Sequence, residues 1–194
     1  HENNALVGTN VKFKISDNWA VYGQFILDDS KTGKNGFQLG LKAFDLFGVN
    51  NLHIQTEINK VSAYTYAHAD STQNFTHYNQ AIAHPLGAGF FESVSIINYM
   101  RKDFFIELKF NYAQYNEDSL GYHHYGKDIF KSDYSIAETD INPIQTTLIF
   151  QDIRLGYLIN PKTNMQVLIG LSNRTEENGW WEKETQYFYF GIRT

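Results

Sequence analysis

Apolar and polar residues alternate with a period of two along much of this chain, and such alternation is typical of β-strands with one apolar and one polar face. In residues 52–59 (LHIQTEIN), Leu52, Ile54 and Ile58 fall on one face, whereas Gln55 and Glu57 fall on the other. The same alternation recurs in residues 9–15, 104–112 and 164–172. The pattern predicts an all-β chain with nine strands, which are centred near residues 10, 23, 41, 57, 96, 109, 152, 168 and 189.

The predicted strands are joined by connections of two lengths. Tight turns rich in Asn, Asp, Gly and Pro are expected at residues 16–18, 48–51, 101–103 and 160–164. Longer polar connections are expected between them, at residues 28–35, 64–89, 116–145 and 173–184. An antiparallel meander with short turns at one end and long loops at the other is the arrangement of an outer-membrane β-barrel. Several strands also have the roughly ten residues that a tilted strand needs to cross a bilayer.

The composition of the two predicted faces fits a membrane better than a packed core. One face carries Leu, Ile, Val and Phe, and the other carries Gln, Asn, Lys and Glu at mid-strand, where a wet lumen accepts them. Aromatic side chains, which comprise 15 Phe, 13 Tyr and 3 Trp, gather at strand ends, as they do at membrane interfaces. A soluble β-sandwich is the alternative, because its half-buried strands alternate in the same way.

An odd strand number does not suit a bacterial single-chain barrel, in which the number of strands is even. An open sheet in hydrocarbon would leave two unpaired edges, at several kcal/mol for each unsatisfied backbone group. Either the count is wrong by one, or residues 1–194 are part of a single, larger barrel domain. The start at His1, without Met or an apolar leader, favours the second interpretation.

Charge and residue counts exclude several other classes of protein. The net charge of −5 argues against nucleic acid as a partner, because phosphate binding needs clustered positive charge. The absence of cysteine excludes disulfides, thiolate metal sites and cysteine nucleophiles. No run of about 20 apolar residues is present, so helical membrane spans are not expected. Within the predicted lumen, Asp152 and Arg154 are expected to pair with Lys109 or Glu107.

The connection 64–91 is the most distinctive segment, because it is rich in His, Tyr, Asn and Gln. The intervals between His68, His77 and His84 do not fit metal ligation, so we expect no metal and no cofactor. Residue 79 is Asn rather than the Ser that follows the His of outer-membrane phospholipases, so we expect no catalytic residue. The simplest interpretation is a loop that folds over the lumen, with a turn at residues 84–87 in which Gly87 adopts positive φ.

Four stretches of the chain resemble the capsule-assembly Wzi-like family, and within it the RemB-like gliding-motility proteins of gliding bacteria. They are YGQFILDD (22–29), GFQLGLKAFDLFGVNNLHIQTEIN (36–59), YTYAHADSTQNFTHYNQAIAHPLGAGF (64–90) and YFYFGIRT (187–194). The stretch THYNQ…AHPLG is the most specific. The resemblance covers nearly the whole chain in order, and it is to the later portion of those proteins, whose barrels are larger.

The resemblance implies an integral β-barrel of the bacterial outer membrane that is not an enzyme. Its role would be structural or surface-binding, linked to exopolysaccharide (capsule) attachment or to gliding motility and the associated secretion machinery. The partners would be outer-membrane lipid, surface polysaccharide and other motility or secretion components. The alternative functions are a porin-like diffusion channel and, less favoured, an outer-membrane hydrolase.

If polysaccharide is the ligand, the aromatic and amide composition of the connection 64–91 favours binding there. Three of its aromatic rings would stack on sugar faces, and three polar side chains would hydrogen-bond to sugar hydroxyls. The stacking residues are Tyr66, Phe75 and Tyr78, and the hydrogen-bonding residues are His77, Asn79 and His84.

Overall fold

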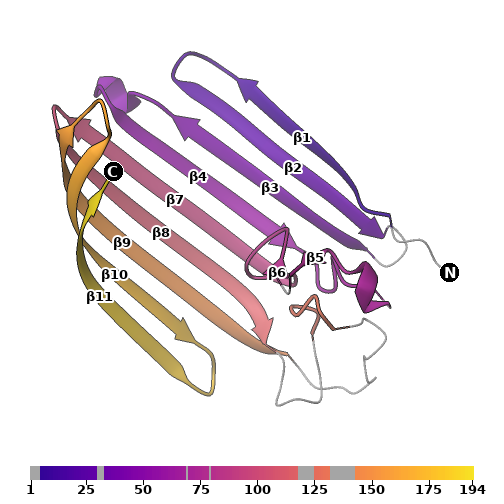
Figure 1. Ribbon diagram of the computed structural model, residues 1–194. Helices are drawn as coiled ribbons and strands as arrows, with labels where there is room; N and C mark the ends of the chain where they lie inside the picture. The colour runs from indigo at the N-terminus through magenta and orange to yellow at the C-terminus, as the bar shows by residue number, and fades with distance from the viewer. Residues whose placement is uncertain (1–4, 30–32, 69, 79, 118–124, 132–142) are drawn as a thin grey trace.

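The computed structural model describes residues 5–29, 33–68, 70–78, 80–117, 125–131 and 143–194. Nine strands form one antiparallel sheet in which each strand pairs with the next one along the meander (Figure 1). The strands of this sheet are β1 (Val7–Lys14), β2 (Trp19–Asp29), β3 (Lys34–Ala43), β4 (Leu52–Val61), β7 (Phe90–Arg101), β8 (Phe104–Glu117), β9 (Ile144–Asn160), β10 (Met165–Glu177) and β11 (Glu182–Arg193).

The remaining elements are short and lie in the connections. A hairpin of β5 (Thr76–His77) and β6 (Gln80–Ala81) lies between β4 and β7. Two 3₁₀ turns, η1 (Leu46–Gly48) and η2 (Ser71–Gln73), are the only helical elements of the described residues. Neither of these turns is long and apolar enough to span a membrane.

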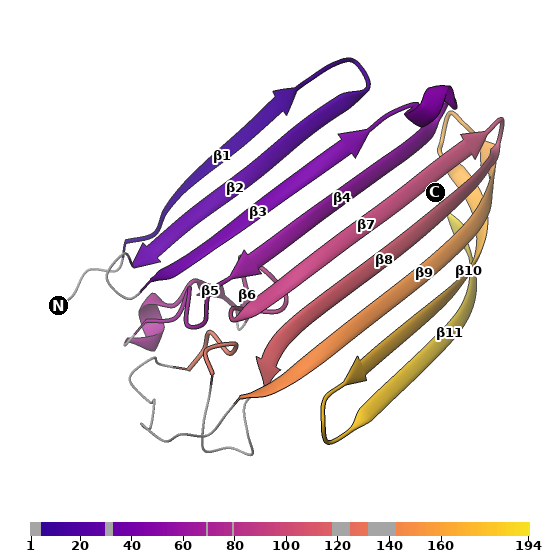
Figure 2. The ribbon, with the colours of Figure 1, turned by 180° about the vertical axis from the view of Figure 1, so that it is seen from behind.

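The prediction of an all-β antiparallel chain is confirmed, and a strand lies at each of the nine predicted centres. The sheet is twisted and curved, but it is not closed into a barrel. Strands β1 and β11 each pair with one neighbour only, and Figures 1 and 2 place them at opposite margins of the sheet. The nine strands therefore form an open wall with two free edges.

The prediction of four long connections is wrong for two of them. Only residues 30–33 separate β2 from β3, and only residues 178–181 separate β10 from β11. The ladder between β10 and β11 continues through polar residues as far as the pair Glu177–Glu182. Because backbone pairing does not require apolar side chains, these strands extend beyond the apolar part of the sheet, and their polar ends resemble loops in the sequence.

The register places side chains of opposite character on the two faces. We call the apolar face the one that carries Ile54, Ile97, Leu108, Ile153 and Leu171, which are cross-strand neighbours in one row. Large apolar side chains of this face are exposed on β1–β3 and β8–β11, by fractions from 38% at Val167 to 83% at Phe190, and those of β4 and β7 are half-buried. The described residues thus leave this face without a packing partner.

Charged side chains of the apolar face lie only near the ends of the strands. Arg101 lies at the end with the short turns, and Lys60, Glu177, Glu182 and Glu184 lie at the end with the long connections. On this face of β8, apolar side chains run from Phe104 to Tyr112, which is about 27 Å of extended chain. The apolar band of an outer-membrane barrel is about 25 Å tall.

The opposite face, which we call the polar face, carries the next row of cross-strand neighbours: Lys42, Gln55, Ile96, Lys109, Asp152 and Ser172. At its loop end, this face is covered by the described residues of 62–89, that is, 62–68, 70–78 and 80–89, together with residues 125–131. A small apolar core lies beneath them and contains Val61, Tyr66, Ala88, Phe90, Ala113, Tyr115, Ile129 and Leu148. This core positions the connecting segments over the polar face.

Candidate functional site

The segment 62–89 is tied to the loop end of the sheet by hydrogen bonds to β2 and β3. The Tyr66 N–H donates to the carboxylate of Asp28 at 2.9 Å, and Lys34 Nζ donates to the carbonyl of Ala67 at 3.1 Å. The Ser62 N–H donates to the carbonyl of Asn35 at 2.8 Å. These contacts hold the first part of the segment against strands that lie far upstream in the sequence.

The segment 125–131 packs against the first one through the backbone. The Tyr64 N–H donates to the carbonyl of Gly126 at 2.9 Å, and the Ala88 N–H donates to the carbonyl of Lys127 at 3.1 Å. Gly87 has φ of +74°, as expected for the turn at residues 84–87, and a Cβ there would lie 2.3 Å from the Lys127 carbonyl oxygen. Glycine is thus required at this close approach of the two segments.

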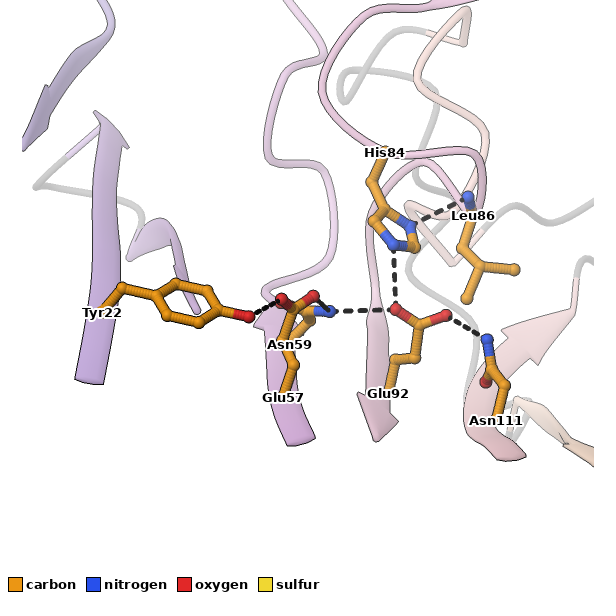
Figure 3. A network of polar contacts seen from close by, with 7 residues as sticks. All are labelled: Tyr22, Glu57, Asn59, His84, Leu86, Glu92 and Asn111. Carbon is orange, nitrogen blue, oxygen red and sulfur yellow. Dashed lines mark hydrogen bonds and ion pairs between the residues drawn. The ribbon is translucent and has the colours of Figure 1, made fainter. Parts of the chain in front are cut away.

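His84 fastens the end of the segment to a buried carboxylate of β7 (Figure 3). The Leu86 N–H donates to His84 Nδ1 at 3.2 Å, so Nε2 carries the proton and donates to Glu92 at 3.0 Å. Glu92 is 6% exposed and accepts two further hydrogen bonds, from Asn59 at 3.0 Å and from Asn111 at 2.8 Å. Three donors therefore compensate the burial of this carboxylate.

The network continues from Asn59 toward β2, as Figure 3 shows. Asn59 also donates to Glu57 at 3.0 Å, and the Tyr22 hydroxyl donates to the other oxygen of Glu57 at 2.6 Å. Gln55 donates to the Tyr22 hydroxyl at 3.0 Å. One chain of polar contacts thus links β2, β4, β7 and β8 to the segment above them.

A second network lies on the polar face of β8–β11. Arg154 donates to Glu107 at 2.9 Å, forms an ion pair with Asp152 at 2.8 Å and donates to the Tyr189 hydroxyl at 2.8 Å. Tyr189 and Ser172 both donate to the same oxygen of Asp152, which is 2% exposed. The predicted pairing of Arg154 with Glu107 is confirmed, and the two residues are direct cross-strand neighbours.

The structure divides the predicted ligand-binding residues into two groups. Tyr66 is 4% exposed, and burial, together with the nearby Asp28 carboxylate, raises the pKa of its hydroxyl. His84 points into the sheet toward Glu92. Both side chains therefore face the sheet: the Tyr66 ring belongs to the buried core, and both ring nitrogens of His84 are hydrogen-bonded.

The second group is exposed around the hairpin of β5 and β6. Phe75 is 37% exposed and Tyr78 is 88% exposed, and the rings of His77 and Tyr78 lie 4.3 Å apart between centroids. Asn79 lies outside the described residues. Within the predicted set, Phe75, His77 and Tyr78 are thus the side chains that a large ligand could reach directly.

Four residues of the first network were not among the predicted site residues, although the alternation places them on the polar face. They are Tyr22, Asn59, Glu92 and Asn111. Their contacts join residues 19 to 35 positions apart in the sequence and depend on the register of the strands, which the alternation does not specify.

In the described part of the chain, no group of three or more His, Asp or Glu side chains is arranged to hold a metal ion.

Searches among models of protein families, curated proteins and solved structures find no match to this chain. The resemblance to the Wzi-like family therefore stays a prediction from the motifs of the sequence. The site itself consists of the segments 62–89 and 125–131, which we call the platform. His84 and Asp28 hold the platform over the polar face of the sheet.

Proposed function

We propose that this chain is part of the wall of a closed β-barrel in the bacterial outer membrane, with the apolar face in contact with lipid. The observation that carries the proposal is the exposure of large apolar side chains on seven of the nine strands, β1–β3 and β8–β11. A soluble protein would bury a continuous apolar surface of this size. The apolar side chains on this face of β8 extend over about 27 Å, which matches the height of a hydrocarbon band.

The polar face supports the same proposal, because it suits a lumen. It carries charged residues at mid-strand, among them Asp152, Arg154 and Glu107, and their partners are side chains of the same strand or of the neighbouring one. Hydrocarbon would not accept this face, and a dry core would require more apolar side chains on it. The segments 62–89 and 125–131 would then partly cover the lumen at its loop end.

The role that we propose for this barrel is structural or surface-binding, in exopolysaccharide attachment or in gliding motility and its secretion machinery. The support for this role is the resemblance of the motifs together with the exposed ring pair of His77 and Tyr78 on the fastened platform. Exposed aromatic rings beside polar groups are suited to stacking on sugar faces.

Single cysteines test the membrane proposal, because the chain has no cysteine of its own. Ile96 and Ile97 are adjacent in β7 but lie on the polar and the apolar face, respectively. In vesicles with brominated lipid, a fluorophore on Ile97→Cys of the full chain should be quenched, and one on Ile96→Cys should not. Equal quenching at both positions, or a chain that stays monodisperse without detergent, would contradict the proposal.

The surface-binding role is tested separately, with purified exopolysaccharide of the bacterium that carries the protein. Deletion of residues 68–84 should weaken polysaccharide binding and leave the quenching at Ile97→Cys unchanged. If this deletion does not affect binding, the platform has no role in surface binding. The proposal that the chain is part of a membrane wall would still hold.

A further inference from the structure

The polar face of β1–β4 contains an open hollow of about 520 Å³, away from the loop platform. Its lining consists largely of amide, lysine and tyrosine side chains from four adjacent strands. We call these residues the amide strip: Asn10, Lys12, Tyr22, Gln24, Gln38, Lys42, Gln55 and Glu57.

The ring of Tyr22 is fixed at the centre of the amide strip. Gly40 is the cross-strand neighbour of Tyr22, and a Cβ at residue 40 would lie 2.1 Å from the Tyr22 Cζ. The ring can therefore lie over the backbone of β3 only because residue 40 is glycine. Its hydroxyl is held by Glu57 at 2.6 Å and by Gln55 at 3.0 Å. The result is a rigid aromatic surface that lines the hollow.

The amide groups in the cross-strand row next to Tyr22 are available to hydrogen-bond to a ligand. Asn10 and Gln24 are cross-strand neighbours, as are Gln24 and Gln38. Asn10 and Gln24 are exposed, and Gln38 is half-buried. Each amide offers two N–H donors and one carbonyl acceptor, the combination that binds vicinal hydroxyls of a sugar.

Two lysines give the amide strip a positive charge. Lys12 is the cross-strand neighbour of Tyr22, and Lys42 Nζ lies 5.4 Å from the centroid of the Tyr22 ring. The carboxylate of the strip, Glu57, is already hydrogen-bonded by Tyr22 and Asn59. With two lysines and this one carboxylate, the strip carries a net charge of 2 − 1 = +1, although the chain as a whole carries a net charge of −5.

We propose that the amide strip binds an acidic oligosaccharide, that is, a chain of sugars with carboxylate groups. A sugar ring would stack on Tyr22, its hydroxyls would hydrogen-bond to Gln24 and Gln38, and its carboxylate groups would pair with Lys12 and Lys42. This inference rests on the proposed function, because it takes the polar face to be a lumen that polysaccharide enters. It adds a second site, distinct from the platform, and the chemical class of the ligand.

The test measures binding of hexagalacturonate and of neutral cellohexaose to the full chain in lipid nanodiscs by isothermal titration calorimetry. The variant with both Lys12→Gln and Lys42→Gln should bind hexagalacturonate about tenfold more weakly, since it loses two exposed ion pairs. Gln38→Ala should weaken the binding of both sugars. Lys109→Gln is the matched control, because Lys109 lies on the same face outside the hollow.

Each outcome decides the inference. If Lys109→Gln weakens binding as much as the double variant does, attraction is a general property of the lumen, and the amide strip is not a site. If hexagalacturonate does not bind, the inference fails, whereas quenching at Ile97→Cys would still support the membrane wall. Tighter binding of cellohexaose than of hexagalacturonate would contradict the acidic class.

Discussion

The two faces of this sheet share one backbone but follow opposite rules of burial. On the apolar face, Phe188 and Phe190 are 74% and 83% exposed, and charged side chains lie only near the strand ends. On the polar face, Asp152 and Glu92 are 2% and 6% exposed, and each accepts hydrogen bonds from neighbouring side chains. A water-soluble domain has the reverse arrangement, with large apolar side chains inside and carboxylates outside.

This contrast indicates how each face is stabilised. The apolar face depends on an environment that the chain itself does not provide, and hydrocarbon would provide it. The polar face depends on specific partners, such as Arg154 for Asp152 and His84 for Glu92. A substitution should therefore be costly on the apolar face when it adds a charge, and costly on the polar face when it removes a partner.

The largest effect is expected for a charge added to the apolar face. Ile97→Arg should lower the free energy of unfolding in lipid vesicles by about 2–4 kcal/mol, the cost of Arg near the bilayer midplane. The measurement is a urea titration of the full chain in those vesicles. Ile96→Arg is the control, because Ile96 is the cross-strand neighbour of Gln55 and Lys109 on the polar face.

We expect Ile96→Arg to cost less than about 1 kcal/mol, because its guanidinium would remain in contact with water. Equal costs at the two positions would mean that both faces have the same surroundings. In that case the contrast between the faces would not reflect a membrane.

The removal of a partner on the polar face should have the second largest effect. Arg154→Leu leaves Asp152 buried without its cationic partner and should cost about 2 kcal/mol, less than a fully buried pair because Arg154 is 37% exposed. Adding Asp152→Asn should recover part of that loss, since the buried charge is then absent. Additive losses in this double-mutant cycle would show that the two side chains are not coupled.

The strand positions could be predicted from the sequence because alternation is a local property. Gln55 and Glu57 between Ile54 and Ile58 define two faces without any knowledge of neighbouring strands. The connections at residues 28–35 and 173–184 were mispredicted for the same reason. Polar residues such as Glu177 and Glu182 pair through their backbones, and the type of side chain does not reveal this pairing.

The candidate site was harder to predict from the sequence, because it depends on contacts between distant strands. The composition of residues 64–91 indicated a folded loop, and Gly87 has the predicted positive φ. It did not distinguish His84, which turns inward to Glu92, from His77, which is exposed on the hairpin. That distinction requires the register that brings Glu92 beside Asn59.

A smaller effect is expected when the platform is released from the polar face. His84→Ala removes one donor from Glu92 and the acceptor of the Leu86 N–H, and it should cost about 1 kcal/mol of global stability. Proteolytic cleavage of the platform in the intact chain should become faster. His77→Ala, which changes an exposed side chain, should leave the cleavage rate unchanged, and an equal acceleration in both variants would show that His84 does not fasten the segment.

The smallest effect on stability, with the most specific effect on function, is expected for Tyr78→Ala. Tyr78 is 88% exposed, so its loss should change the free energy of unfolding by no more than about 0.5 kcal/mol. Binding of purified exopolysaccharide, measured by calorimetry, should nevertheless weaken, because the ring is available for stacking. Phe47→Ala is the matched control: Phe47 is 91% exposed and has positive φ like Tyr78, but it lies in the turn between β3 and β4. If both variants weaken binding equally, an exposed aromatic ring elsewhere on the chain contributes as much to polysaccharide binding as Tyr78 does. The platform would then have no specific part in recognition.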